Sequence, residues 1–169
     1  MAALSQVQWE KIFGTFSYKE GKSGRVIPDK AWVAANIVRL RVPYGNDSDP
    51  LIAMLYCHRK VALSIEAAFD ELEQAGLLYL VRSVDGCYVP RHILWKPAKP
   101  LSRHSWGGAL DLNAKYFPYG SQKQQDARLV AALARHGFAC GHKDGGLWKT
   151  TYDPMHFEWT YVPPNKEQP

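Results

Sequence analysis

The segment SRHSWGGALDLN at residues 102–113 constrains the fold more than any other part of the sequence. Its last five residues alternate in character, so that in a strand Asp111 points to one face and Leu110 and Leu112 point to the other. A carboxylate between two buried leucines needs a partner, and a metal ion is one such partner. His104 lies seven positions before Asp111, and both residue types bind zinc. The segment therefore predicts two ligands of a metal site, with a hydrogen-bonded pair in a turn as the alternative.

Two glycines, Gly107 and Gly108, separate the two candidate ligands. Glycine lets the backbone turn tightly or approach another group closely. We expect these glycines to keep side chains out of the space in which a substrate reaches the metal.

Length and composition are those of an ordinary globular chain. The 169 residues fit one domain, and the hydrophobic and charged fractions of 46% and 22% are typical of such a domain. Within it, residues 1–76 are expected to form a helical or irregular part and residues 77–162 the core that carries the site. We expect a monomer.

The chain is basic, with a net charge of +5 and a pI near 9.1. Nucleic-acid binding is the first hypothesis for a basic protein. Because Lys and Arg are scattered and form no run, we do not expect nucleic acid as a partner. A mild positive field suits an anionic cell-wall or membrane surface equally well.

Cysteines and leader signals point to a reducing compartment. Cys57, Cys87 and Cys140 form no CxxC pair and are expected to be buried free thiols. The N-terminal residues lack the basic and apolar regions of a signal peptide, and no apolar run approaches the roughly 20 residues of a membrane helix. We therefore expect synthesis in the cytoplasm without a signal peptide and no integral membrane segment.

The apolar pattern predicts an α+β fold with a small antiparallel sheet and flanking helices. Apolar residues three and four positions apart indicate helices, and β-branched or alternating runs indicate strands. An Asp-Gly pair between two such runs indicates a hairpin. The expected elements are helices over residues 51–76 and 124–136, strands over residues 36–42 and 151–162, a hairpin over residues 77–95, and loops over residues 114–125 and 138–148.

The last predicted strand supplies a third ligand. Its alternation places His156 and Glu158 on one face and Phe157 on the other. His104, Asp111 and His156 together would give zinc three protein ligands and leave one position open. That is the arrangement of a catalytic rather than a structural zinc site.

A catalytic site of this kind also needs a general base and a fixed positive donor for a developing oxyanion. Asp153, three residues before His156, is the better placed base. Glu158 is its rival and could instead orient His156. Arg91, shortly before the ligand segment, is the candidate donor, with Arg103 behind it.

Three segments of the sequence resemble a known family. SRHSWGGALDLN resembles the SxHxxGxAxD signature of VanY-like D-Ala-D-Ala carboxypeptidases and phage L-alanyl-D-glutamate endopeptidases, zinc peptidases with a hedgehog-type fold. DPMHFEW resembles the family's closing segment and DGCYVPR its upstream segment. The resemblance implies one zinc ion held by His104, Asp111 and His156.

The same resemblance implies roles for the remaining candidates. Asp153 would be the catalytic base, Arg91 would stabilise the oxyanion, and Ser102 would contact the substrate. The substrate would be the stem peptide of peptidoglycan. Cys140 stands where many relatives carry tryptophan, and Asp153 stands where the dipeptidase branch carries glutamate.

The aspartate favours an L-alanyl-D-glutamate endopeptidase of the endolysin type, acting on the cell wall after release during phage lysis. A D-Ala-D-Ala carboxypeptidase is one alternative. A catalytically inactive, zinc-stabilised binding module, as in the hedgehog signalling domains, is another.

Overall fold

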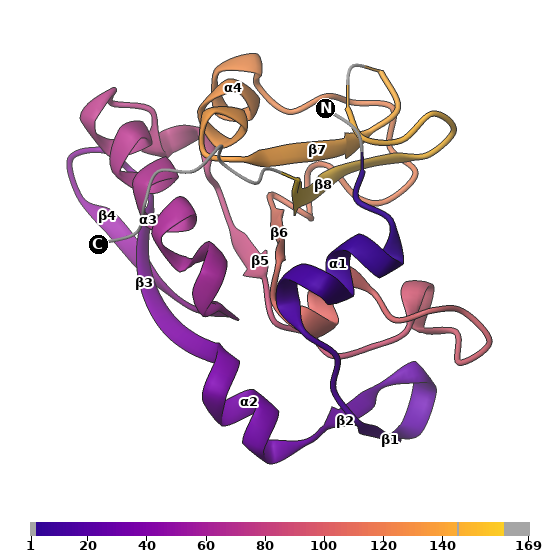
Figure 1. Ribbon diagram of the computed structural model, residues 1–169. Helices are drawn as coiled ribbons and strands as arrows, with labels where there is room; N and C mark the ends of the chain where they lie inside the picture. Colours follow the sequence, from indigo (N-terminus) through magenta and orange to yellow (C-terminus); the bar gives the residue numbers. More distant parts are fainter. Residues whose placement is uncertain (1–2, 145, 161–169) are drawn as a thin grey trace.

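A computed structural model describes residues 3–144 and 146–160, and within them it shows four α-helices and three antiparallel sheets (Figure 1). The helices are α1 (Gln6–Phe13), α2 (Lys30–Asn36), α3 (Arg59–Gln74) and α4 (Ala127–Arg135). The strands are β1 (Tyr18–Glu20), β2 (Val26–Pro28), β3 (Ile37–Gly45), β4 (Pro50–His58), β5 (Val84–Gly86), β6 (Ala109–Leu112), β7 (Phe138–His142) and β8 (Tyr152–Trp159). The predicted α+β class with small antiparallel sheets is confirmed. The division at residue 76 stays a prediction.

The four-stranded sheet carries the residues of interest and has the order β5-β6-β8-β7. In its register Leu110 pairs with Phe157 and Asp111 pairs with His156. Leu110 and Phe157 are fully buried in the apolar core. The alternation expected for both strands therefore turns the leucines and Phe157 to the core, and it leaves Asp111 and His156 as a cross-strand pair on the opposite face. Residues 161 and 162 of the predicted last strand lie outside the described residues.

Helical periodicity predicted two helices, of which one is confirmed with shorter bounds and the other only in part. α4 follows its cap Asp126 and buries Leu129 and Leu133, within the predicted range 124–136. The predicted helix over residues 51–76 is wrong in its first part, because helix α3 begins only at Arg59. The apolar face of α3, with Val61, Ile65, Ala68, Phe69 and Leu72, is buried.

Residues 50–58 form strand β4 because they pair with β3 along its whole length. The predicted strand over residues 36–42 is thus one half of a hairpin, and the turn-rich residues after it form the connection. The outer side of β4 exposes Met54 and Tyr56, while Leu55 and Cys57 are buried. Buried and exposed residues thus alternate with the period of a strand. The sequence does not reveal this alternation, because both sets of residues are apolar.

The predicted hairpin over residues 77–95 is also wrong. Residues Leu78–Leu80 form a short 3-10 turn, and β5 pairs with β6 rather than with the residues that follow it. The second half instead pairs with the N-terminal part of the chain through a bridge between Arg25 and Arg91. Asp85 accepts from the amide of Ala114, which follows β6, and this contact links β5 to the end of that strand; its carboxylate also accepts from the hydroxyl of Ser83.

Residues 138–148, predicted as a loop, begin with strand β7. All five residues of β7 are buried, and the strand pairs with β8. Phe138 packs in the core. Its burial stabilises the strand even though the glycines that follow favour a loop. The loop expected over residues 114–125 is confirmed.

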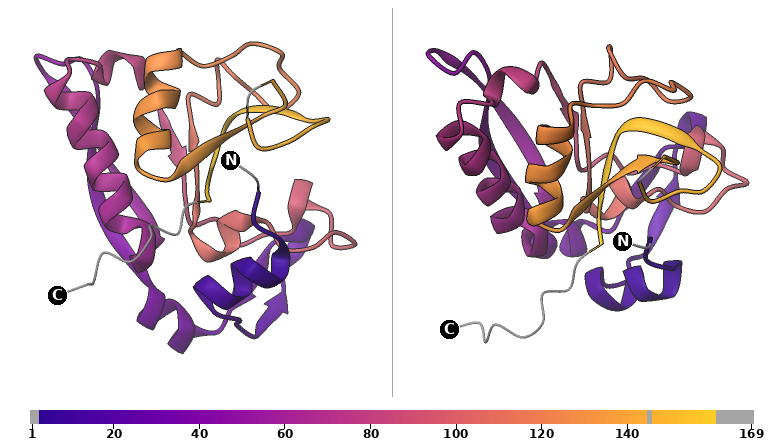
Figure 2. Two further views of the ribbon diagram at one scale, coloured as in Figure 1. Left: turned by 45° about the horizontal axis from the view of Figure 1, so that its top comes forward. Right: turned by 90° about the horizontal axis from the view of Figure 1, so that it is seen from above.

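The N-terminal residues close the other side of the molecule. Helix α1 buries Trp9 and Phe13 in the same core as α3 and the four-stranded sheet. The views of Figure 2 show α3 lying along β3 and β4, with α1 and the β1–β2 hairpin on another side. The three cysteines are free and buried, as predicted.

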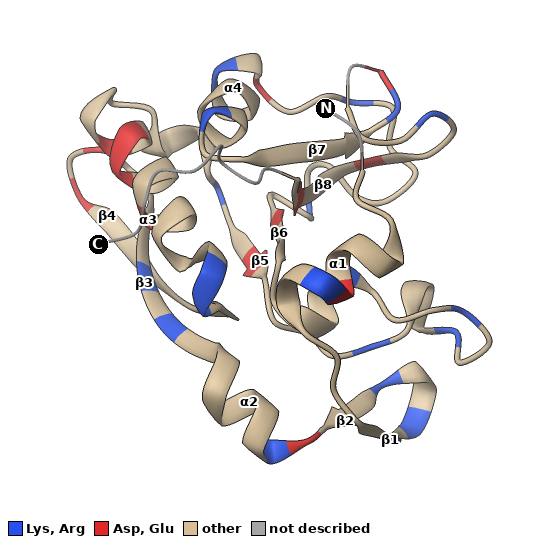
Figure 3. Ribbon diagram, in the orientation of Figure 1, with Lys and Arg blue, Asp and Glu red and all other residues tan. Residues whose placement is uncertain are grey.

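Two surface properties bear on the remaining expectations. Among the described residues, none of the helices has both the length and the apolar character that crossing a membrane requires. Among the described residues, Lys and Arg lie on the helices, on β3 and on several loops, and several of them lie around β1 and β2 (Figure 3).

Candidate active site

Three separate elements position the three candidate ligands. His104 lies in a 3-10 turn, Arg103–Trp106, which follows the bridge between residues 92 and 101 and precedes β6. Asp111 lies in β6 and His156 lies directly opposite on β8. The strand register thus fixes two of the side chains, and the turn brings the third over them.

The side-chain atoms of the three residues meet at nearly equal distances. His104 Nε2 lies 3.1 Å from Asp111 Oδ2 and 3.1 Å from His156 Nδ1, and His156 Nδ1 lies 3.1 Å from Asp111 Oδ1. Tetrahedral zinc with bonds of about 2.1 Å would hold its ligand atoms about 3.4 Å apart. Among residues 3–144 and 146–160, this is the group of His, Cys, Asp and Glu side chains that could hold a metal ion.

The outer nitrogens of both imidazoles are already engaged. His104 Nδ1 donates to the carbonyl oxygen of Cys87 at 2.9 Å, and His156 Nε2 lies 3.5 Å from Glu158 Oε2. With its outer nitrogen as the donor, each ring has a lone pair on the nitrogen that faces Asp111. Two such lone pairs beside a carboxylate repel one another unless a proton or a cation lies between them. The donor set therefore fits a zinc ion.

The pKa values of Asp111 and His156 agree with a cation-binding site. Burial would raise the pKa of Asp111, but His104 and His156 outweigh it and hold that pKa far below its ordinary value. Burial would lower the pKa of His156, but its contacts with Asp111 and Glu158 raise it to about 10. Without a metal the site thus holds a proton on His156, which a zinc ion must displace.

Asp153 has the properties of a general base. It lies in β8 beside Gly141 of β7, it is 9% exposed, and within the described residues its Oδ1 has no hydrogen-bond partner. Burial raises the pKa of Asp153 to about 6, against the opposing charges of His156 and Arg91. A carboxylate with a pKa near 6 can accept a proton at neutral pH and release it again in the same reaction cycle.

Arg91 is half-buried and belongs to the same electrostatic group. Burial lowers the pKa of its guanidinium, and the charges of Asp111 and Asp153 act in the opposite direction. The guanidinium carbon lies 5.2 Å from the ring centroid of Trp95. Its place beside both carboxylates fits the predicted role of a positive donor.

Glu158 and Arg103 form a different arrangement from the one the sequence suggested. Arg103 does not stand behind Arg91, because its Nε donates to Glu158 Oε1 at 3.3 Å and its other nitrogens bind Gln6 and the carbonyl of Leu4. Glu158 is 3% exposed and lies between Arg103 and His156. Of its two predicted roles, this placement favours orienting His156 over acting as the base.

Ser102 lies beside the site but is occupied by local contacts. It is 6% exposed, its hydroxyl caps the turn by accepting from the amide of His104, and its own amide donates to the carbonyl of Arg91 at 2.9 Å. Its contact with a substrate stays a prediction.

The glycines of the ligand segment serve the core rather than the substrate space. A Cβ on Gly108 would lie 2.6 Å from Cζ2 of Trp9 and 3.2 Å from Cζ of Phe13. The absence of a side chain at Gly108 therefore makes room for the ring of Trp9 in α1. The expectation that this residue leaves room for a substrate is wrong.

Sequence reasoning missed Trp148. Its ring stacks on that of His156 at 5.3 Å with an angle of 19°, so an aromatic face covers one ligand candidate. The residue lies in an irregular segment after β7, and no periodicity there points to the site. Chain proximity to His156 was the one signal that could have suggested it.

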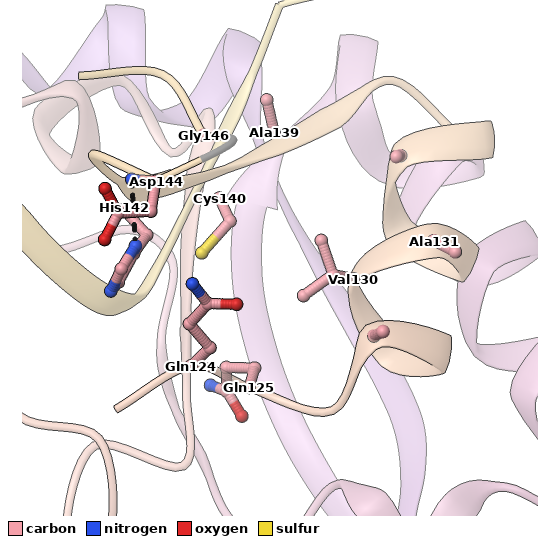
Figure 4. A pocket seen from close by; sticks show the side chains of 11 residues that line it. Gln124, Gln125, Val130, Ala131, Ala139, Cys140, His142, Asp144 and Gly146 are labelled. Atoms are coloured by element: carbon pink, nitrogen blue, oxygen red, sulfur yellow. Dashed lines mark hydrogen bonds between the residues drawn. The ribbon is translucent and has the colours of Figure 1, made fainter. Parts of the chain in front are cut away.

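A separate cavity of about 260 Å³ lies between α4 and β7 (Figure 4). Gln124, Cys140 and His142 line it, and the amide of Asp144 donates to His142 Nδ1 at 3.1 Å. None of the candidate ligands lines this cavity. The chemistry therefore belongs to the group around His156 and not to the cavity.

Comparison with known families bears on whether this geometry is a metal site or a hydrogen-bonded pair. Residues 96–159 match the D-alanyl-D-alanine carboxypeptidase family. The resemblance inferred from the signature segments is thereby confirmed over that stretch. The search of curated proteins and the search of solved structures returned no match.

The match to the D-alanyl-D-alanine carboxypeptidase family covers His104, Asp111, Asp153 and His156, and it begins after Arg91. It supports a hydrolase of the peptidase class. Zinc as the metal is implied by the family and agrees with the donor set.

Proposed function

We propose that this protein is a zinc-dependent peptidase that hydrolyses the stem peptides of peptidoglycan. The observation that carries the proposal is the meeting of three ligand side chains through contacts of 3.1 Å, close to the buried carboxyl of Asp153. One oxygen of that carboxyl has no hydrogen-bond partner among the described residues. A structural zinc site would need a fourth ligand and no base. The predicted hedgehog-type zinc-peptidase fold is part of this proposal.

His104, Asp111 and His156 would hold the ion, which when bound supplies Lewis-acid polarisation of the scissile carbonyl. Asp153 accepts a proton from the attacking water and passes it to the leaving amine. Arg91 faces the negative charge that develops on the carbonyl oxygen. Glu158 keeps the ring of His156 in place through Nε2, and Arg103 in turn holds Glu158.

The specific activity that we propose is L-alanyl-D-glutamate endopeptidase activity on the cell wall, following cytoplasmic synthesis and release during phage lysis. The aspartate at position 153 supports it, since the dipeptidase branch carries glutamate there. D-Ala-D-Ala carboxypeptidase activity is the second candidate, because the family that matches residues 96–159 bears that description.

Mass spectrometry of fragments released from defined peptidoglycan tests both candidates. The endopeptidase releases peptides that begin with D-glutamate, whereas the carboxypeptidase releases free D-alanine. Asp153→Asn is the matched control and should release neither while still binding zinc. A wild-type protein that binds zinc and releases no fragment would instead be the inactive binding module.

A further inference from the structure

Two guanidinium groups lie over the same aromatic ring near the candidate site. The guanidinium carbon of Arg91 is 5.2 Å from the ring centroid of Trp95, and that of Arg25 is 5.6 Å from it. The two arginines are also backbone neighbours in an isolated antiparallel bridge. In the described part of the chain no carboxylate lies within ion-pair distance of either guanidinium. Two cations are thus held together beside a ring that is 42% exposed.

The backbone under Trp95 is strained. Leu94 and Trp95 have φ values of 54° and 58°, a left-handed conformation that residues other than glycine rarely adopt. A Cβ on Gly24 would lie 2.2 Å from the carbonyl oxygen of Trp95, so only glycine allows this approach. Strain of this kind persists where the surrounding contacts fix it, and it concentrates at ligand sites.

The surrounding contacts that fix the strained segment come from His92. Its Nδ1 lies 2.6 Å from the carbonyl oxygen of Lys99, and its Nε2 lies 3.1 Å from Glu20 of β1. Its amide donates to the carbonyl of Gly24 at 2.9 Å. The N-terminal β1–β2 hairpin, whose connection carries Arg25, therefore holds the segment that presents Trp95 (Figure 1).

The position of the pair relative to the proposed chemistry indicates what it could bind. Arg91 lies close enough to Asp111 and Asp153 for their charges to act on it, whereas Arg25, which lies over the same Trp95 ring, is exposed. An extended peptide advances about 3.4 Å per residue. A group that lies one to three residues from a scissile bond beside Arg91 can therefore reach Arg25.

We propose that Arg25, presented beside Trp95, binds a carboxylate of the peptide substrate close to the scissile bond. This inference rests on the proposed peptidase function and adds a determinant of substrate choice that lies outside residues 96–159. Two carboxylates of a stem peptide share this chemistry, the α-carboxylate of D-glutamate and the C-terminal carboxylate. Guanidinium–carboxylate hydrogen bonds are the strongest recognition available to such a group.

The test uses four synthetic stem peptides, in which each of the two carboxylates is either free or amidated, and measures kcat/KM with the zinc-loaded protein. Arg25→Gln should lower kcat/KM about tenfold or more on peptides with the recognised carboxylate free, and it should leave the amidated counterparts unchanged. Arg25→Lys should recover part of the loss. The carboxylate whose amidation abolishes the effect of Arg25→Gln on kcat/KM is the one that Arg25 binds. Arg41→Gln, at an exposed arginine of β3, is the matched control.

Equal losses on acid and amide peptides would overturn the inference, because they would show that Arg25 only supports the fold. Unchanged kinetics on all four peptides would overturn it as well. If the wild type hydrolyses none of them, the proposed function fails, and calorimetric binding of the same peptides to the zinc-loaded protein takes its place. Weaker binding of the amidated peptides to the wild type but not to Arg25→Gln would support carboxylate recognition by Arg25. Equal binding of acid and amide peptides to the wild type would refute it.

Discussion

We expect Glu158→Gln to weaken zinc binding about tenfold while leaving the fold in place. Glu158 is 3% exposed and lies 3.5 Å from His156 Nε2 and 3.3 Å from Arg103 Nε. Glutamine keeps the size of the side chain but has one acceptor oxygen for the two partners, and it loses the charge. The substitution therefore isolates the electrostatic orientation of His156 from the packing of the side chain.

The size of this effect follows from the contact distances. Loss of a carboxylate partner behind a metal-bound histidine costs about 10-fold to 100-fold in affinity. The separation of 3.5 Å between Glu158 and His156 is long for a hydrogen bond. The lower end of the range, about tenfold or 1.4 kcal/mol, is thus expected.

Competition with a chromophoric zinc chelator at pH 7.5 measures the dissociation constant. Glu73→Gln, at an exposed residue of α3, should match the wild type. Urea unfolding of both metal-free variants shows whether the fold is intact. A Glu158→Gln protein that binds zinc like the wild type but hydrolyses no substrate would refute the orienting role of Glu158. That result would make Glu158 the base instead of Asp153.

Three further predictions concern the same group. Because burial raises the pKa of Asp153 from about 4 to about 6, its ionisation destabilises the metal-free fold increasingly as pH rises between these values. Asp153→Asn should therefore stabilise that protein by about 2–3 kcal/mol at pH 7.5 and hardly at all at pH 4, and equal effects in urea unfolding at both pH values would contradict the assignment. Zinc must displace the proton of His156, whose pKa is about 10, so the apparent zinc affinity should rise about tenfold per pH unit between pH 7 and 9. A chelator competition that is independent of pH would argue against His156 as a ligand. Gly108→Val, which would overlap the ring of Trp9, should cost about 1–3 kcal/mol in unfolding free energy. Unchanged stability with lost substrate affinity would restore the idea that Gly108 leaves room for a substrate.

The sequence alone allowed the candidate ligands to be found because alternation works where a strand has one polar face. Asp111 and His156 stand among apolar neighbours in β6 and β8, and the register of these strands brings them together. The capped helix α4 was equally readable, since its apolar spacing has one period throughout. These features depend on residues close together in the chain.

The features that could not be read depend on partners far away in the chain. β5 pairs with β6 instead of closing a local hairpin, and β4 is a strand because β3 lies beside it. Arg103 turns toward Glu158 and α1 because Leu4 and Gln6 offer acceptors there. Periodicity carries no information about such long-range choices.

The glycine interpretation failed for a related reason. Gly108 was expected to face the substrate because it lies between two ligand candidates. Its missing side chain in fact makes room for Trp9, about one hundred positions earlier in the sequence. A glycine signals that something approaches closely but not which group does so.

Titration of the metal-free protein with zinc, followed by hydrolysis of purified peptidoglycan, measures whether the metal drives the reaction. We expect that hydrolysis is absent without metal, rises with added zinc and saturates at one ion per chain. His104→Ala, Asp111→Ala and His156→Ala should each fail to reach this endpoint. Hydrolysis that persists in the thoroughly chelated protein, or that survives the loss of His156, would contradict this expectation.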